Sequence, residues 1–144
     1  VMRLVRENFL RVRVHVRDQA DAFQRLGARY GVQWTPATLV LAPDGTERHR
    51  MEGFLPADEF LAQLSLGLGQ VAFAQSKWAD AEKRLSVVAD DFPDSDAAPE
   101  ALYWTGVAKY KDANDKAVLP DTARKVSERF PHSVWAKKAS VWLG

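Results

Sequence analysis

Cysteine is absent from the 144 residues of this sequence. These residues can therefore form no disulfide, supply no thiolate to a metal and carry out no thiol–disulfide exchange. Long apolar runs are absent too, since none approaches the roughly 20 residues of a membrane-spanning helix, and no secretory signal stands at the start. The sequence opens at Val1 instead of Met, so we expect a mature or trimmed piece of a longer polypeptide.

An excess of charge of one sign is also lacking. Twenty basic and 19 acidic side chains give a formal net charge of +1, which predicts neither a nucleic-acid nor a membrane partner. Hydrophobic content of 47% and charged content of 27% are ordinary for globular proteins. The length suits one medium domain or two small ones. The lack of cysteine does not fix a compartment; we expect the cytoplasm, with the periplasm as the alternative, and we expect no cofactor.

The most informative stretch runs from Tyr30 to Thr46 (YGVQWTPATLVLAPDGT). Gly31 predicts the end of a helix, because glycine adopts the left-handed region without a steric penalty. Pro36 biases the residue before it toward an extended backbone. The apolar residues 38–41 then predict a short strand. The Asp-Gly pair that follows is a strong hairpin signal, with the return strand expected over residues 47–53.

Other elements are expected on both sides of this stretch. Residues 1–8 read as the last turns of a helix, and residues 10–16 alternate apolar and basic side chains as a half-buried strand does. Asp18 is expected to cap a helix that ends at Tyr30, and a further helix is expected to start after Leu55. The expected buried positions of these two helices are Ala22, Phe23 and Leu26 in the first, and Phe60, Leu61 and Leu64 in the second.

The order helix, Tyr-Gly-Val, Trp-Thr-Pro, strand, Asp-Gly, strand, Gly53, helix resembles the C-terminal half of the thioredoxin fold over residues 1–66. The resemblance implies that Pro36 is a cis-proline. It also implies a central strand, ending in Cys-x-x-Cys, between the strands at 10–16 and 38–41, which this sequence does not encode. Three explanations stand open: the natural chain is longer, the two strands pair directly, or a partner donates the strand. The alternation at 10–16 fits a strand buried on both faces poorly.

After residue 66 the pattern becomes wholly helical. Leu66-Gly-Leu-Gly69 is expected to be a soft joint, followed by helices over residues 70–75, 79–92, 97–111 and 119–130. A shift of 38 positions superposes the breaks Phe92-Pro93 and Phe130-Pro131. It also superposes other residues: Val88 and Val126, Ser95 and Ser133, Ala98 and Ala136, Ala101 and Ala139, Trp104 and Trp142, Gly106 and Gly144.

These paired residues resemble tetratricopeptide repeats, in which helical hairpins stack to bury a shared core. We expect about two units plus a terminal helix, with the thioredoxin-like part as their cap. The predicted fold is thus mixed (α+β or α/β): a partial thioredoxin-like sheet with flanking helices over residues 1–66, then an all-α tetratricopeptide-like array over residues 67–144. The whole resembles bacterial thioredoxin-family proteins with a helical-repeat tail.

Trp34, Thr35 and Pro36 form the best candidate site. The resemblance implies that the Thr35 backbone pairs with a bound peptide strand and that Trp34 supplies an aromatic wall. The alternative is that Pro36 only shapes the turn. No catalytic, cofactor-binding or metal-binding residue is expected.

Other groups have simpler explanations. His15, His49 and His132 lack metal-site spacing. The acids from Asp90 to Glu100 lack the Gly and Glu positions of a calcium loop, so we expect them to cap helices and to compensate helix dipoles. The basic bias of residues 3–17 could contact phosphate but suits a solvated face better. The tryptophans Trp78, Trp104, Trp135 and Trp142 could line a peptide groove, although packing between hairpins explains the repeat-equivalent pair better.

Two functional classes follow. The first is a protein–protein interaction module, not redox-active as written, with a protein or peptide partner and self-association through unpaired strand edges as a further option. The second is part of a thiol–disulfide oxidoreductase whose Cys-x-x-Cys lies upstream of Val1. The third interpretation is a degenerate relative of the thioredoxin family that has no functional site.

Overall fold

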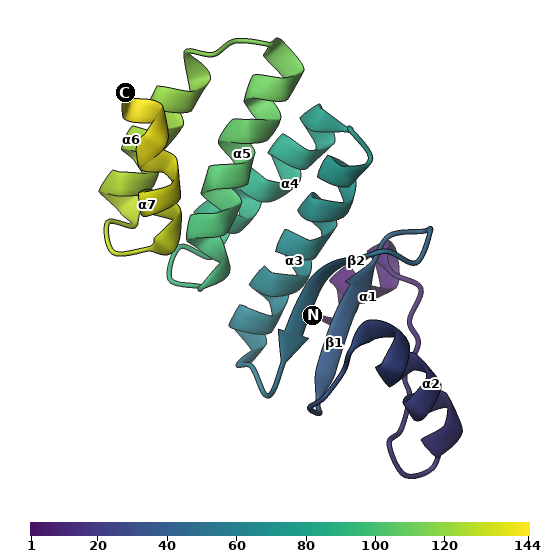
Figure 1. Ribbon diagram of the computed structural model, residues 1–144. Coiled ribbons are helices and arrows are strands. Elements are labelled where there is room, and N and C mark those ends of the chain that lie inside the picture. Colours follow the sequence, from purple (N-terminus) through teal and green to yellow (C-terminus); the bar gives the residue numbers. More distant parts are fainter. The chain divides into compact units, whose positions relative to one another are not determined.

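The computed structural model describes residues 1–144 as seven α-helices, one two-stranded sheet and a terminal 3₁₀ helix (Figure 1). The chain divides into two compact units, Val1–Leu55 and Pro56–Gly144. The predicted fold class is confirmed: a small sheet with helices precedes a region of packed helices. The elements are α1 (Met2–Asn8), α2 (Ala20–Tyr30), β1 (Ala37–Leu41), β2 (Glu47–Glu52), α3 (Ala57–Ala74), α4 (Trp78–Asp91), α5 (Ala97–Ala113), α6 (Val118–Arg129), α7 (Val134–Ala139) and η1 (Ser140–Leu143).

The hairpin forms as the Asp-Gly signal predicts. Strands β1 and β2 pair antiparallel, and the turn is fixed by the Thr46 N–H, which donates to Asp44 Oδ1 at 2.9 Å. Gly45 has φ +80°, a conformation that favours glycine. The register shifts near Leu41, so that Arg48 is an additional residue in β2. This bulge brings Glu47 and Arg50 to the same face.

Helix α2 ends where the sequence predicts. Gly31 has φ +62°, and the Val32 N–H donates to the Gly27 carbonyl at 2.8 Å, a pattern that satisfies the last carbonyls of a helix. Its start differs from the prediction. Gln19 is the N-cap, without a side-chain cap, and Asp18 instead lies 3.0 Å from His15 Nδ1. The face expected to be buried is only half-buried.

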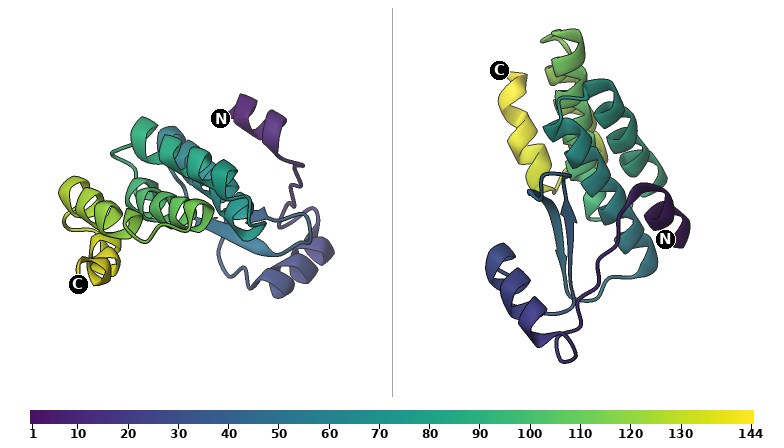
Figure 2. Two further views of the ribbon diagram at one scale, coloured as in Figure 1. Left: turned by 90° about the horizontal axis from the view of Figure 1, so that it is seen from above. Right: turned by 90° about the vertical axis from the view of Figure 1, so that its right-hand side faces the viewer.

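The strand predicted over residues 10–16 is wrong. The link between α1 and α2 has no regular secondary structure (Figure 2, purple), and no backbone hydrogen bond is made by residues 10–14. Leu10 and Val12 are 101% and 82% exposed. Direct pairing of the two predicted strands is excluded as well, because the sheet contains β1 and β2 alone. An alternating pattern makes a strand only where a neighbour satisfies its backbone groups.

The predicted soft joint at Leu66–Gly69 is also wrong. Helix α3 runs without interruption from Ala57 to Ala74, and both of its glycines are buried. The two compact units divide between Leu55 and Pro56 instead. Gly69 has a packing role, because a Cβ built there would lie 2.5 Å from Leu85 Cδ2 of α4. The glycine therefore lets α3 and α4 approach closely.

The second unit packs its helices in sequence order, α3 against α4, α4 against α5, and α5 against α6. A glycine also allows α5 and α6 to approach closely, since a Cβ at Gly106 would lie 2.1 Å from Thr122 Oγ1. None of the helices is both long and apolar enough to cross a membrane. The largest completely buried side chains of this unit are Leu66, Leu85, Val88 and Val126.

The two predicted breaks have matching geometry. The C-caps Phe92 and Phe130 have φ/ψ of −127°/54° and −136°/58°. In both turns a serine three residues later donates to the phenylalanine carbonyl, through its N–H at 3.0 Å and its Oγ at 2.8 Å. The 38-residue shift therefore describes local structure as well as sequence.

Candidate functional site

The loop before β1 presents the three residues that the sequence singled out. Trp34 is 72% exposed, and Thr35 and Pro36 are exposed beside it. The Thr35–Pro36 peptide bond is cis, as the resemblance implied. The bond, the exposed indole and the start of β1 thus lie together in one short segment.

Strand β1 has one paired edge and one free edge. The Gly53 N–H donates to the Pro36 carbonyl at 2.8 Å, which makes these residues a hydrogen-bonded pair. Hydrogen-bonded pairs alternate along an antiparallel ladder, so Thr38 also faces β2, whereas the backbone groups of Ala37 and Leu39 face the other edge. No strand pairs there. The free edge therefore offers regularly spaced N–H and carbonyl groups beside the exposed loop.

Arg50 ties this hairpin to the end of α2. Its Nη2 donates to the Tyr30 carbonyl and its Nη1 to the Gly31 carbonyl at 3.4 Å. The same guanidinium bonds the Glu47 carboxylate through Nε and Nη2, both at 2.8 Å, and Glu52 through Nη1 at 3.0 Å. Tyr30 adds a bond from its hydroxyl to the Gly45 carbonyl at 3.0 Å. These contacts hold the chain on both sides of the loop, and sequence reasoning did not identify them.

The ion pair between Arg50 and Glu47 makes the stability of the first unit depend on pH. The hydrogen bonds from Arg50 lower the pKa of Glu47 from its ordinary value of 4.5. A carboxylate whose folded-state pKa is lowered stabilises the fold above the unfolded-state pKa, and this contribution is lost as the pH falls through the lowered value. We expect Glu47→Gln to destabilise the unit near pH 7, with a difference from the natural chain that shrinks as the pH falls below 4.5. Urea unfolding at a series of pH values measures it, and a difference that is independent of pH would contradict this account.

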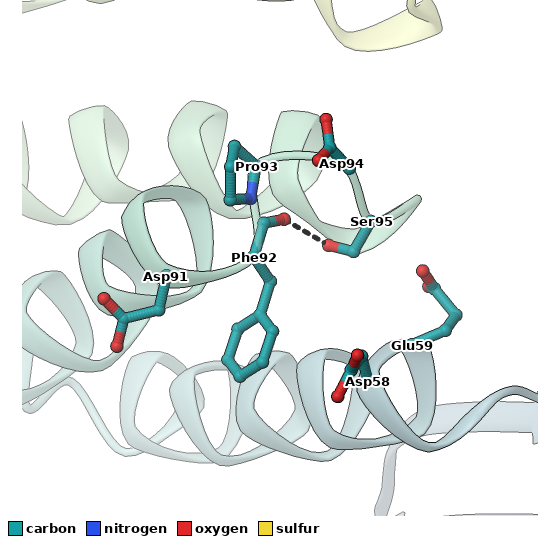
Figure 3. A pocket seen from close by; sticks show the side chains of 7 residues that line it. All are labelled: Asp58, Glu59, Asp91, Phe92, Pro93, Asp94 and Ser95. Atoms are coloured by element: carbon teal, nitrogen blue, oxygen red, sulfur yellow. Dashed lines mark hydrogen bonds between the residues drawn. The ribbon is translucent and has the colours of Figure 1, made fainter.

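A second candidate is an open depression of about 400 Å³ at the α4–α5 turn. Figure 3 shows the Phe92 ring pointing toward α3 and Ser95 bonded to the Phe92 carbonyl. The helix caps expected for these acids do not form: Asp96 caps α5 without a side-chain bond, and its N–H donates to Glu59 Oε2 at 3.0 Å. The lining residues are Asp58, Glu59, Asp91, Phe92, Pro93, Asp94 and Ser95. Acidic side chains and hydrogen bonds within a turn do not by themselves indicate a ligand-binding site. We therefore assign no function to this depression.

Partly buried aromatic rings form a continuous series of contacts through the helical unit, with centroids 4.6–6.3 Å apart. Trp104 contacts Phe73 of α3 and Trp135 of α7. These contacts support the interpretation that the tryptophans pack between hairpins, and not the alternative that they line a peptide groove. Burial raises the pKa of Tyr103. The members are Phe73, Trp78, Tyr103, Trp104, Trp135 and Trp142. The sequence analysis missed Phe73 and Tyr103, which fall outside the tryptophan pattern.

Metal chemistry finds no support in the geometry. No group of three or more histidine, aspartate or glutamate side chains is placed to hold a metal ion. The three histidines belong to separate parts of the chain, and His15 is engaged with Asp18.

Residues 1–67 match the family model described as a thioredoxin-like domain. No curated protein and no solved structure matches the chain. The N-terminal part is therefore a thioredoxin-like domain without cysteine, and a helical region follows it. The match ends inside α3.

Proposed function

We propose that this chain is a protein–protein interaction module whose thioredoxin-like part binds an extended peptide along β1. The observation that carries the proposal is the free edge of β1, which begins directly after the exposed loop of Trp34, Thr35 and Pro36. The absence of cysteine removes the redox pair from these residues and leaves binding as the chemistry that they can perform.

When a peptide adds to the edge of a sheet, backbone hydrogen bonds provide affinity and side-chain contacts provide selectivity. In this proposal the outward N–H and carbonyl groups of Ala37 and Leu39, continued by the backbone of Thr35, pair with the peptide backbone and give affinity without reading its sequence. The Trp34 indole covers one side chain of the peptide and gives selectivity. The contacts of Arg50 to α2 and to both neighbouring glutamates hold the hairpin in place, so little order has to be gained on binding.

We infer further that the helical unit is a tetratricopeptide-like array. The matched turns at Phe92 and Phe130 and the glycine contacts at Gly69 and Gly106 support repetition of one helical-hairpin unit. In this proposal the array adds binding surface for the same protein partner. The cytoplasm is the proposed compartment.

Removing the indole tests the proposed peptide site. We expect Trp34→Ala to weaken a peptide selected on the natural chain from a displayed random library by roughly tenfold, in line with the loss of an aromatic contact residue. The stability of the unit is expected to change little, because the side chain is 72% exposed. Fluorescence anisotropy gives the affinity, and amide chemical-shift changes over residues 34–41 locate the peptide.

The matched control is Val141→Ala, which trims another apolar side chain that is 74% exposed, in the second unit. It is expected to leave peptide affinity unchanged. A library that yields no peptide, or peptides whose shift changes lie elsewhere than β1, would contradict the proposal.

A second candidate function is favoured by the match to the thioredoxin-like domain together with the cis-proline at 36. Here the chain would be part of a thiol–disulfide oxidoreductase whose Cys-x-x-Cys lies upstream of Val1, and the loop would shape access to it. Turnover of insulin disulfides by the longest natural polypeptide containing these residues would favour this function over the pure binding role. Inactivity of a polypeptide with that motif would reject it.

A further inference from the structure

The turn between β1 and β2 contains a chemically reactive pair of residues. Asp44 is the only aspartate in the sequence that a glycine follows. In such a pair the backbone nitrogen of the glycine attacks the aspartyl Cγ with little hindrance, because glycine has no side chain. The new N–C bond closes a five-membered succinimide ring, and one water molecule leaves. Water then opens the ring at either carbonyl and gives aspartate or isoaspartate, in which the main chain runs through Cγ.

In the folded turn both reacting groups are engaged in hydrogen bonds. The Asp44 carboxylate accepts the Thr46 N–H at 2.9 Å, which directs it past the Gly45 nitrogen to the next residue. The Gly45 N–H donates to the Ala42 carbonyl at 2.8 Å, and this bond disfavours the deprotonated amide that makes the attack. Hydrogen bonds from Thr46 also lower the pKa of Asp44, so the carboxyl group stays ionised and loses its oxygen less readily than a carboxylic acid. Ring closure therefore requires the turn to open.

The turn is held closed by two further hydrogen bonds. The Ala42 N–H donates to the Thr46 carbonyl at 2.8 Å, and the Tyr30 hydroxyl of α2 donates to the Gly45 carbonyl at 3.0 Å. Asp44 and Thr46 are exposed, so hydrogen bonds and not burial protect the pair from reaction. A turn held by so few bonds opens locally, without unfolding of the whole unit.

We propose that Asp44 is a modification site, at which isoaspartate forms only when the hairpin turn opens, and that the bond from Tyr30 limits how often it opens. The modified turn does not close again in the same way. Isoaspartate adds one carbon to the main chain, which disrupts the pairing of Ala42 with Thr46 and displaces the Gly45 carbonyl from Tyr30. The free α-carboxylate on the opened turn is the group that isoaspartyl methyltransferases methylate. This site is independent of the proposed peptide site at β1.

The test incubates the whole chain at neutral pH, folded in buffer and unfolded in guanidinium chloride. Peptide mapping separates isoaspartyl from aspartyl peptides, and methyl transfer from S-adenosylmethionine by an isoaspartyl methyltransferase quantifies the product. We expect the folded chain to form isoaspartate at Asp44 at least roughly tenfold more slowly than the unfolded chain. Tyr30→Phe should raise the rate in the folded chain by roughly fivefold, the effect of losing one hydrogen bond on the opening equilibrium. In guanidinium chloride the same variant should react at the natural rate.

Two control variants accompany the test. Tyr103→Phe makes the same change in the second unit and should leave the rate at Asp44 unaltered. Asp44→Glu should abolish the signal, because the longer side chain cannot form the five-membered ring. Hydrogen exchange at the Gly45 and Thr46 amides shows whether Tyr30→Phe opens the turn alone, as expected, or unfolds the unit. The proposal is overturned by equal rates in the folded and unfolded chains, by a Tyr30→Phe rate that stays at the natural value, or by acceleration that occurs only with unfolding of the whole unit.

Discussion

Replacing Leu85 with alanine is expected to lower the free energy of unfolding of the helical unit by about 2–5 kcal/mol, the range for a large buried side chain truncated to alanine. Leu85 is completely buried in the core cluster that joins α3, α4 and α5. The truncation removes the buried apolar atoms of the Leu85 side chain and leaves a cavity beside Gly69. Urea unfolding followed by circular dichroism at 222 nm, where this unit supplies most of the helix, measures the loss.

A double-mutant cycle sharpens the expectation. Gly69→Ala alone should destabilise the unit, because the added methyl would lie 2.5 Å from Leu85 Cδ2 and 2.6 Å from Leu85 Cγ. In the Leu85→Ala background the methyl has room, so the same change should cost less or stabilise. Val87→Ala, at a position 45% exposed in the same helix, is the control and should have a small effect. A loss of less than about 1 kcal/mol for Leu85→Ala would mean that the core is not packed as described.

Gly106→Ala is expected to destabilise the same unit by about 2 kcal/mol, because overpacking costs more than the roughly 1 kcal/mol that alanine gains in a helix. The new Cβ would lie 2.1 Å from Thr122 Oγ1 and 2.6 Å from Thr122 Cβ. The second atom is attached directly to the backbone, so a rotamer change cannot clear the contact and the two helices must separate. The midpoint of thermal unfolding should fall accordingly.

The control for this prediction is another glycine inside a helix. A Cβ at Gly27 meets only the Val32 carbonyl oxygen, at an ordinary 3.7 Å, so Gly27→Ala should be neutral or stabilising. Thr122→Ala should rescue Gly106→Ala in part, since it removes Oγ1 and Cγ2 but keeps Cβ. Equal effects of the two glycine substitutions would contradict the close approach of α5 and α6.

The sequence predicts well wherever short-range chemistry decides the structure. The turn at Asp44, the left-handed Gly31 and the helix breaks at Phe92 and Phe130 all follow from neighbouring residues, and all are observed. The alternation at residues 10–16 failed because a strand is a property of a pair. The glycines of α3 failed for the opposite reason. They were interpreted as flexible, but both are buried in a continuous helix, and at Gly69 the Leu85 side chain of α4 fills the space where a Cβ would lie.

The candidate site divides in the same way. Trp34, Thr35 and Pro36 could be named because the loop resembles that of the thioredoxin fold; the structure adds that all three are exposed, and their role in binding stays a proposal. The anchoring role of Arg50 could not, because it depends on a bulge that turns Glu47 to the same face and on a helix end 20 residues earlier. Contacts of this kind arise only after the chain has folded.

Helix α3 extends past residue 67, where the thioredoxin-like match ends, and this affects how the protein can be dissected. A cut at that residue would sever a helix in mid-course and discard Gly69 and Ala72, two of its buried residues. The remaining stub would expose Leu66, which is 1% exposed in the intact chain. All of α3 belongs to the second compact unit, so a fragment designed around the matched residues should either end at Leu55 or keep the whole helix with the helices that bury it.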